Sequence, residues 1–191
     1  MNYTTLESPL GTILLAAAGG ALAGLYFVGQ RYEPEVGPDW KRDDDAAPFA
    51  AARRWLDTYF AGKEPASPPP LSPHGTPFQQ RVWREIARIP RGETITYAEL
   101  ASRAGNPAAV RAAGGATGRN PISLIVPSHR VVGSDGSLTG YAGGLERKRR
   151  LLALEAGSAN SRRSGATSRA GSYPAAGNAE DAEEIGLSGN G

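Results

Sequence analysis

Apolar and polar positions alternate along residues 1–32, and short turns interrupt the alternation. The apolar runs at residues 13–18 and 21–28 are separated by a Gly-Gly pair. Short alternating runs joined by glycine turns are typical of antiparallel strands. We therefore expect the chain to begin with an antiparallel meander, followed by an acidic and irregular stretch over residues 33–45.

The spacing of the apolar residues then becomes helical. Phe49, Ala52, Leu56 and Tyr59 recur every three or four positions within residues 48–61. This spacing predicts an amphipathic helix that ends near Gly62.

A proline-rich stretch divides the chain. Residues 63–75 hold five prolines, which predicts an extended and semi-stiff linker. We expect an N-terminal α/β domain over residues 1–62, and a second domain over residues 76–156. Residues 157–191 are rich in Gly, Ser, Ala, Asn and Arg and have few apolar positions, so we expect this tail to be disordered.

The second domain opens with a helix start signal. Thr76 and Gln79 match a capping box, and Pro77 takes the first helical position. Apolar spacing predicts that this helix continues to about residue 89. Further patterns predict helices over residues 96–101, 108–116 and 145–155, and a short buried strand over residues 122–126. The fold class is therefore α+β, with an N-terminal antiparallel sheet and one helix, then a mostly helical C-terminal domain.

The two short helices around a Gly-Asn-Pro break match the outline of a helix-turn-helix. The second helix is unusual, because Arg111 is surrounded by small residues that include Ala112, Gly114 and Gly115. A slim helix with one arginine suits a narrow groove and one inserted side chain. Two alternatives are a tightly packed core helix with Arg111 at its edge and a transcription regulator. The regulator would need polar base-reading residues on this helix, and they are absent.

Charge is concentrated in the middle of the chain. The formal net charge is +2, but residues 76–155 carry 12 Lys or Arg against 6 Asp or Glu. Residues 1–75 carry 6 against 9, and residues 156–191 carry 3 against 4. A localised basic block is typical of a nucleic-acid binder, although a solvated arginine-rich surface has the same composition.

The composition also excludes several kinds of chemistry. The chain has no cysteine, so disulfides, zinc–thiolate sites and thiol chemistry are excluded. With only two histidines, we expect no metal site and no cofactor. We also expect no membrane segment and no secretory signal, and hence a cytoplasmic location.

One short sequence motif gives the strongest indication of function. Pro127-Ser128-His129-Arg130 follows Asn120-Pro121 and precedes Tyr141-Ala142-Gly143-Gly144. The run resembles the Pro-Cys-His-Arg signature of the alkylguanine-DNA alkyltransferases, with serine in place of the reactive cysteine. The resemblance is dense over residues 76–156 and follows the general layout of residues 1–62. It implies a base pocket beside the helix-turn-helix, no cofactor, and double-stranded DNA carrying alkylated guanine as the partner of a monomer.

The resemblance also implies roles for particular residues. Arg111 resembles the finger that enters the base stack, and Tyr97 resembles the residue that crowds the phosphate and helps rotate the base outward. His129 and Glu155 resemble the relay that activates the cysteine, and Asn120 resembles the residue that braces the turn. The remaining implied DNA contacts are Ala112, Gly114, Gly115 and Arg130. The residues that line the implied base pocket are Val131, Tyr141, Ala142 and Gly143.

Ser128 changes the expected outcome. A serine hydroxyl ionises far above the cysteine value near 8.5 and is a weaker nucleophile than sulfur, so we expect recognition of the lesion without alkyl transfer. A serine-hydrolase interpretation of Ser128, His129 and Glu155 lacks the Gly-x-Ser-x-Gly turn. Ala142 is a second departure, because some relatives have a hydroxyl there.

Two origins of Ser128 are open. The protein is either a natural alkyltransferase-like lesion binder or an active alkyltransferase whose cysteine was replaced. The sequence leaves open the preferred alkyl group, the role of the tail and whether a downstream repair protein is a further partner.

Overall fold

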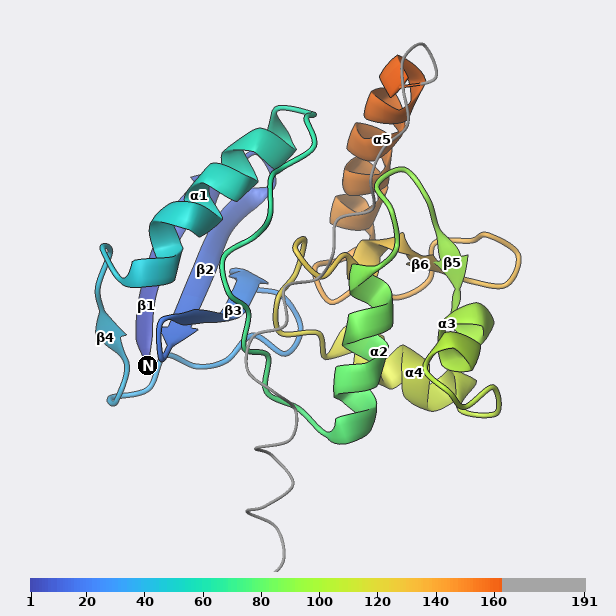
Figure 1. The fold of residues 1–191 in the computed structure, drawn as a ribbon, viewed down its shortest axis with the longest axis horizontal. Helices are drawn as coiled ribbons and strands as arrows, with labels where there is room; N and C mark the ends of the chain where they lie inside the picture. Colours follow the sequence, from blue (N-terminus) through green and yellow to red (C-terminus); the bar gives the residue numbers. More distant parts are fainter. Residues whose placement is uncertain (163–191) are drawn as a thin grey trace, which may run out of the picture.

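The computed structural model describes residues 1–162, so most of the predicted tail lies outside the described residues. Its N-terminal half is a four-stranded sheet in the order β3-β2-β1-β4 (Figure 1). Strands β1 (Asn2–Ser8), β2 (Gly11–Ala18) and β3 (Ala21–Phe27) form the predicted antiparallel meander. The short β4 (Lys41–Arg42) pairs parallel to β1 and was not predicted. Its two exposed charged residues gave no apolar alternation.

Helix α1 (Ala47–Phe60) packs against the sheet (Figure 1). Its buried face consists of the predicted stripe, in which Phe49, Ala52, Leu56 and Tyr59 are at most 2 % exposed. The apolar spacing in the sequence therefore predicted this helix correctly, because burial of one stripe stabilises it.

The C-terminal half is mostly helical, as predicted. Helix α2 (Pro77–Ala87) begins with the predicted capping box, in which the Thr76 hydroxyl accepts from the Gln79 amide and the Gln79 side chain accepts from the Thr76 amide. Helices α3 (Tyr97–Arg103) and α4 (Val110–Gly118) pack against each other and against α2. The indole nitrogen of Trp83 on α2 donates to the Ala116 carbonyl on α4 at 2.8 Å, which ties these two helices together.

Two short strands, β5 (Ile95–Thr96) and β6 (Val131–Val132), pair in parallel and were not predicted. They connect the start of α3 to the segment that follows the Ser-His-Arg motif. Helix α5 (Leu145–Arg162) continues beyond the predicted end at residue 155. No proline interrupts residues 156–162, so the helix can propagate into part of the expected tail.

The predicted strand over residues 122–126 is wrong. All five residues are buried, but they form turns and make only one bridge, between Ile122 and Leu25 of β3. Leu124 has a positive φ of 71°, which a regular strand does not allow. Continuous apolar runs are buried in either case, so the pattern could not distinguish a strand from a buried turn.

The outer edge of β3 joins the two halves. Leu22 exchanges backbone hydrogen bonds of 2.8 Å with Pro70 and Ser72 of the proline-rich stretch. Leu25 exchanges bonds of 2.9 and 3.0 Å with Pro121 and Ser123. The buried apolar residues of both halves form one core cluster. The division into two domains stays a prediction, but the described halves are held together along this edge. No helix in the described part of the chain is long and apolar enough to span a bilayer.

Candidate functional site

Ser128 lies in a short 3-10 helix, η1 (Ser128–Arg130), and its side chain is buried. The amide nitrogen of Asn120 donates to the Ser128 hydroxyl oxygen at 3.2 Å and to the Val126 carbonyl at 2.7 Å. The Asn120 amide oxygen accepts from the backbone of Ile122 at 2.9 Å. Asn120 therefore braces the turn, as the resemblance implied, and also contacts the nucleophile position directly.

Glu155 on α5 is the centre of a buried hydrogen-bond network. Its carboxylate accepts from the Tyr59 hydroxyl and from His129 Nε2, each at 2.7 Å. It also accepts from Arg130 Nε at 2.9 Å and from the Arg130 terminal nitrogen at 2.8 Å. The network joins α1, η1 and α5, and it brings together the predicted His129 and Glu155.

The network sets the proton positions of His129. A carboxylate only accepts hydrogen bonds, so His129 Nε2 carries a hydrogen when it faces Glu155. Burial lowers the pKa of His129 below its ordinary value, against the opposing effect of Glu155, and keeps the ring neutral. His129 Nδ1 is buried and has no hydrogen-bond partner among the described residues. A neutral ring with hydrogen on Nε2 has its lone pair on Nδ1, so this atom can act as a base.

The other members of the network also have displaced pKa values. Burial alone would raise the pKa of Glu155, but His129 and Arg130 outweigh burial and hold that pKa below its ordinary range. Burial and then the Glu155 charge raise the pKa of Tyr59, so its hydroxyl is a permanent donor. The network is therefore one anion held by one permanent cation and two neutral donors.

The folded protein is expected to lose stability as the pH falls. The unfolded chain binds protons at His129 near 6.5 and at Glu155 near 4.5, and both folded pKa values lie lower. The free energy of unfolding should therefore fall below pH 6.5 and fall again below pH 4.5. Urea titrations from pH 8 to pH 4 measure this dependence. His129→Gln should remove the first decrease, whereas the exposed control His74→Gln should keep it. A stability that does not change between pH 8 and pH 5 would contradict the buried neutral His129.

Arg130 has a different environment from the one implied by the resemblance. It was expected among the DNA contacts, but it is only 8 % exposed. Three of its nitrogens donate inside the protein, two to Glu155 and one to the Ile89 carbonyl at 2.6 Å. Its guanidinium group therefore supports the buried network rather than the exposed surface.

The residues expected to line a base pocket lie in β6 and in the loop before α5. The Tyr141 ring meets the His129 ring edge to face, with centroids 6.4 Å apart. A Cβ on Gly143 would lie 2.7 Å from the Tyr141 ring and 3.3 Å from the Phe27 ring, so this position requires glycine. Val131 is buried in β6, and Ala142 is half-buried. These residues place the aromatic ring and the small residues of the loop beside the Ser-His-Arg turn.

Lys148 holds this loop in place and was missed by sequence reasoning. It is fully buried, and its ammonium group donates to the carbonyls of Val131, Thr139 and Gly140 at 2.6, 2.9 and 3.2 Å. Burial lowers the pKa of Lys148 to about 8. A sequence signal existed, because Lys148, Leu151 and Glu155 are three and four positions apart and so share one helix face.

The second helix of the helix-turn-helix exposes small side chains around Arg111, as expected. Arg111, Ala112 and Gly115 of α4 are exposed. Gly114 is half-buried, and its Cα faces the Tyr97 ring, where an added Cβ would lie 3.8 Å from a ring carbon. The Tyr97 hydroxyl donates to the Thr139 carbonyl at 3.2 Å. Tyr97 therefore lies between α4 and the pocket loop.

Two further residues act in the network without a clear signal in the sequence. Tyr59 was predicted only as part of an apolar helix stripe, yet its hydroxyl donates to Glu155. The Arg91 guanidinium lies 4.8 Å from the centroid of the Tyr59 ring. Tyrosine in an apolar stripe packs through its ring whether or not its hydroxyl has a role, so spacing alone could not reveal this contact.

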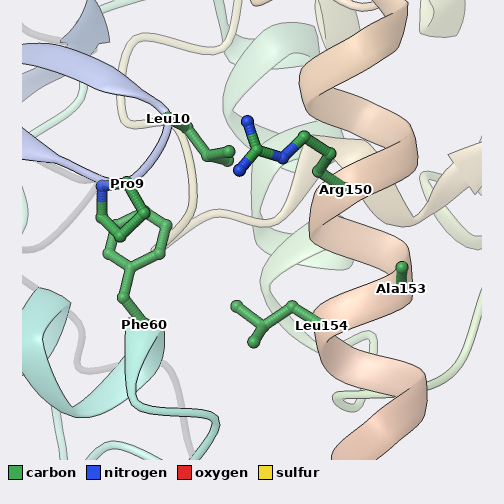
Figure 2. A pocket seen from close by; sticks show the side chains of 6 residues that line it. All are labelled: Pro9, Leu10, Phe60, Arg150, Ala153 and Leu154. Carbon is green, nitrogen blue, oxygen red and sulfur yellow. The ribbon is translucent and has the colours of Figure 1, made fainter.

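A separate hollow of about 320 Å³ lies between the β1–β2 turn, the end of α1 and α5 (Figure 2). Its walls are Pro9, Leu10, Phe60, Arg150, Ala153 and Leu154. None of the predicted site residues lines it. The buried hydrogen-bond network and the unpartnered His129 nitrogen instead place the candidate chemistry at Ser128.

The α+β fold and the Asn-Ser-His-Glu arrangement beneath the helix-turn-helix define a protein of the alkylguanine-DNA alkyltransferase class. Residues 1–73 match the family model of the 6-O-methylguanine DNA methyltransferase ribonuclease-like domain, and residues 77–157 match that of the DNA binding domain. The chain therefore belongs to the 6-O-methylguanine DNA methyltransferase family.

Individual relatives agree with this assignment. The chain is 49 % identical over 156 residues to the methylated-DNA–protein-cysteine methyltransferase of Mycobacterium leprae, covering 81 % of this chain and 92 % of the relative. The Mycobacterium tuberculosis protein of the same name is 47 % identical over 155 residues, with the same coverage. A crystal structure of Mycobacterium tuberculosis OGT in complex with DNA superposes with a TM-score of 0.78 at 46 % identity, covering 83 % of this chain and 94 % of that chain.

Proposed function

We propose that the protein binds duplex DNA, recognises guanine that carries an alkyl group on its exocyclic O6 oxygen, and does not remove that group. The observation that carries this proposal is the environment of Ser128. A member of this family that has no cysteine keeps the bracing Asn120 and the buried His129–Glu155 pair around a serine hydroxyl.

Recognition requires that the damaged base leave the helical stack. Enzymes that do chemistry on a base extrude it from the duplex into a pocket, where its edge is then read by hydrogen bonds and stacking. The exposed Arg111 can fill the gap, and the small residues Ala112 and Gly115 let the helix backbone approach the groove closely. The extruded guanine would then enter the loop that contains Tyr141 and Gly143.

Transfer fails at the nucleophile. Alkyl transfer breaks the bond between the guanine oxygen and the alkyl carbon, and it forms a bond from that carbon to the attacking atom. In the relay that the family resemblance implies, His129 acts through a water to take the proton of a thiol that ionises near pH 8.5, but a serine hydroxyl ionises far higher. An oxyanion hole offers no help, because an alkyl carbon develops no oxyanion.

The test is equilibrium binding over a salt series. The affinity should fall with rising salt for every duplex, because phosphate contacts release counterions. At each salt concentration, a duplex with one methylated guanine should bind more tightly than the same duplex with guanine. Equal affinities would contradict lesion recognition. A preference for one promoter sequence over the lesion would instead support a transcription regulator, which the exposed alanine and glycine residues of α4 do not favour.

Arg111→Ala should reduce both lesion binding and base extrusion. Flipping costs a few kcal/mol, and a side chain that fills the gap offsets part of this cost, so we expect lesion binding to weaken about tenfold. A fluorescent base analogue beside the lesion measures extrusion. Arg54→Ala on α1, also an exposed arginine, serves as the control and should leave the signal unchanged. An undiminished signal in Arg111→Ala would show that this helix does not extrude the base.

A further inference from the structure

A strained tyrosine lies where the N-terminal half meets the DNA-facing helix. Tyr32, in the segment between β3 and β4, has a positive φ of 62°. Only two residues other than glycine in the described chain have this conformation, and the other is Leu124 near the Ser128 turn. Such strain persists only where the surroundings impose it, and it is concentrated at functional positions.

The backbone around Tyr32 is well anchored. The Arg31 amide donates to the Ala142 carbonyl at 3.0 Å, which joins this segment to the base-pocket loop. The buried Gln30 side chain accepts from the Phe27 amide at 2.8 Å, and the Glu33 carboxylate accepts from the Gly29 amide at 2.6 Å. Tyr32 is therefore presented on an anchored segment beside the loop that contains Ala142, while 43 % of its surface is exposed.

Two arginines converge on the Tyr32 ring. The Arg31 guanidinium lies 4.8 Å from the ring centroid, and the Arg119 guanidinium lies 4.4 Å from it. Both arginines are exposed, and neither forms an ion pair with another residue of the described chain. The ring quadrupole attracts each cation but does not neutralise it. Both charges therefore remain available to an anion from solution, and guanidinium groups bind phosphate well.

The position of Arg119 identifies that anion. Arg119 caps the C-terminal end of α4, and Arg111 lies near its N-terminal end. At about 1.5 Å per residue, the two arginines are about 12 Å apart along the helix. Phosphates on one strand are spaced about 3.4 Å along the duplex axis. If α4 lies along that axis with Arg111 in the base gap, Arg119 would meet phosphates about three to four nucleotides from the gap.

We propose that Arg31, Tyr32 and Arg119 form a second DNA-contact surface, the arginine–tyrosine cluster, that binds backbone phosphates flanking the extruded nucleotide. This inference rests on the proposed function, because it takes the same duplex as the ligand. It assigns a DNA contact to the N-terminal half of the chain. The cluster contacts phosphates rather than bases, so it contributes affinity without selecting the lesion.

The test compares salt slopes of the full chain on duplexes with and without one methylated guanine. The double variant Arg31→Gln/Arg119→Gln should bind both duplexes about five- to tenfold more weakly near 0.1 M salt, and its slope should become shallower by about one to two. The ratio between the two duplexes should not change. Arg31→Lys/Arg119→Lys keeps both charges and should retain the slope of the unaltered chain.

Two single variants separate the ring from the charges. Tyr32→Asn removes the ring with a residue that tolerates positive φ, and it should weaken binding about two- to threefold. The charge-matched control Arg54→Gln should leave the slope unchanged. A double glutamine variant whose slope equals that of Arg54→Gln would overturn the proposal. If the unaltered chain itself does not distinguish the two duplexes, lesion recognition fails, whereas a slope that still depends on Arg31 and Arg119 supports the cluster independently.

Discussion

Ser128→Cys is expected to convert the protein into a one-turnover alkyl acceptor. The bracing Asn120 lies 3.2 Å from the nucleophile position, and the His129–Glu155 pair is formed at 2.7 Å, so only the sulfur is missing. His129, acting through a water as the resemblance implies, would lower the cost of forming the thiolate, and the fixed turn would hold the sulfur beside Asn120. After incubation with a methylated oligonucleotide, intact mass spectrometry should show one added methyl group per chain, compared with none for the unaltered protein.

The control places a cysteine elsewhere. Ser67→Cys lies exposed in the proline-rich stretch and should gain no mass. If Ser128→Cys folds and binds the damaged duplex but gains no methyl group, the site differs from an active one in more than its nucleophile. That result would favour a natural alkyltransferase-like binder as the origin of Ser128. A reactive variant would support descent from a working alkyltransferase.

Glu155→Ala is expected to cause the largest loss of stability of any single substitution in the site. Glu155 is fully buried and accepts from Tyr59, His129 and Arg130. Its removal leaves the Arg130 charge uncompensated in the interior, and such a loss costs about 3–5 kcal/mol. Urea unfolding measures the change as a lower midpoint.

Glu146→Ala is the matched control on the same helix. Glu146 is exposed and paired with Arg149 at 2.6 Å, and surface ion pairs contribute about 0–1 kcal/mol. The double variant Glu155→Leu/Arg130→Met removes both charges and should recover part of the loss, because no unpaired charge is then buried. If Glu155→Ala is no less stable than Glu146→Ala, the carboxylate does not hold the site together.

The sequence predicted those elements whose stability depends on local chemistry. The Thr76–Gln79 capping box and the buried apolar face of α1 were both confirmed. Both features depend on residues that are close together in the sequence, so a sequence pattern can reveal them. The β5–β6 pair was missed, because each strand has two residues and its partner is distant in the chain. The buried turn at residues 122–126 was mistaken for a strand, since its backbone bonds go to Asn120 and Leu25 rather than to a ladder.

The same contrast between features set by local sequence and features set by distant contacts applies to the site. The resemblance placed Asn120, Ser128, His129 and Glu155 together, and the distances agree with that placement. Tyr59 on α1 belongs to the other half of the chain, and its hydroxyl reaches Glu155 on α5 only in the folded protein, which spacing cannot reveal. Arg130 was expected at the DNA, but the buried Glu155 charge requires it inside.

Recognition of the lesion without its removal can be observed in a single incubation. The unaltered protein is mixed with a duplex that carries a single methylated guanine, the complex is isolated, and both partners are analysed by mass spectrometry. We expect the complex to form, the protein mass to stay unchanged and the methylated guanine to be recovered intact. A protein heavier by one methyl group at Ser128, together with a repaired guanine, would contradict this expectation.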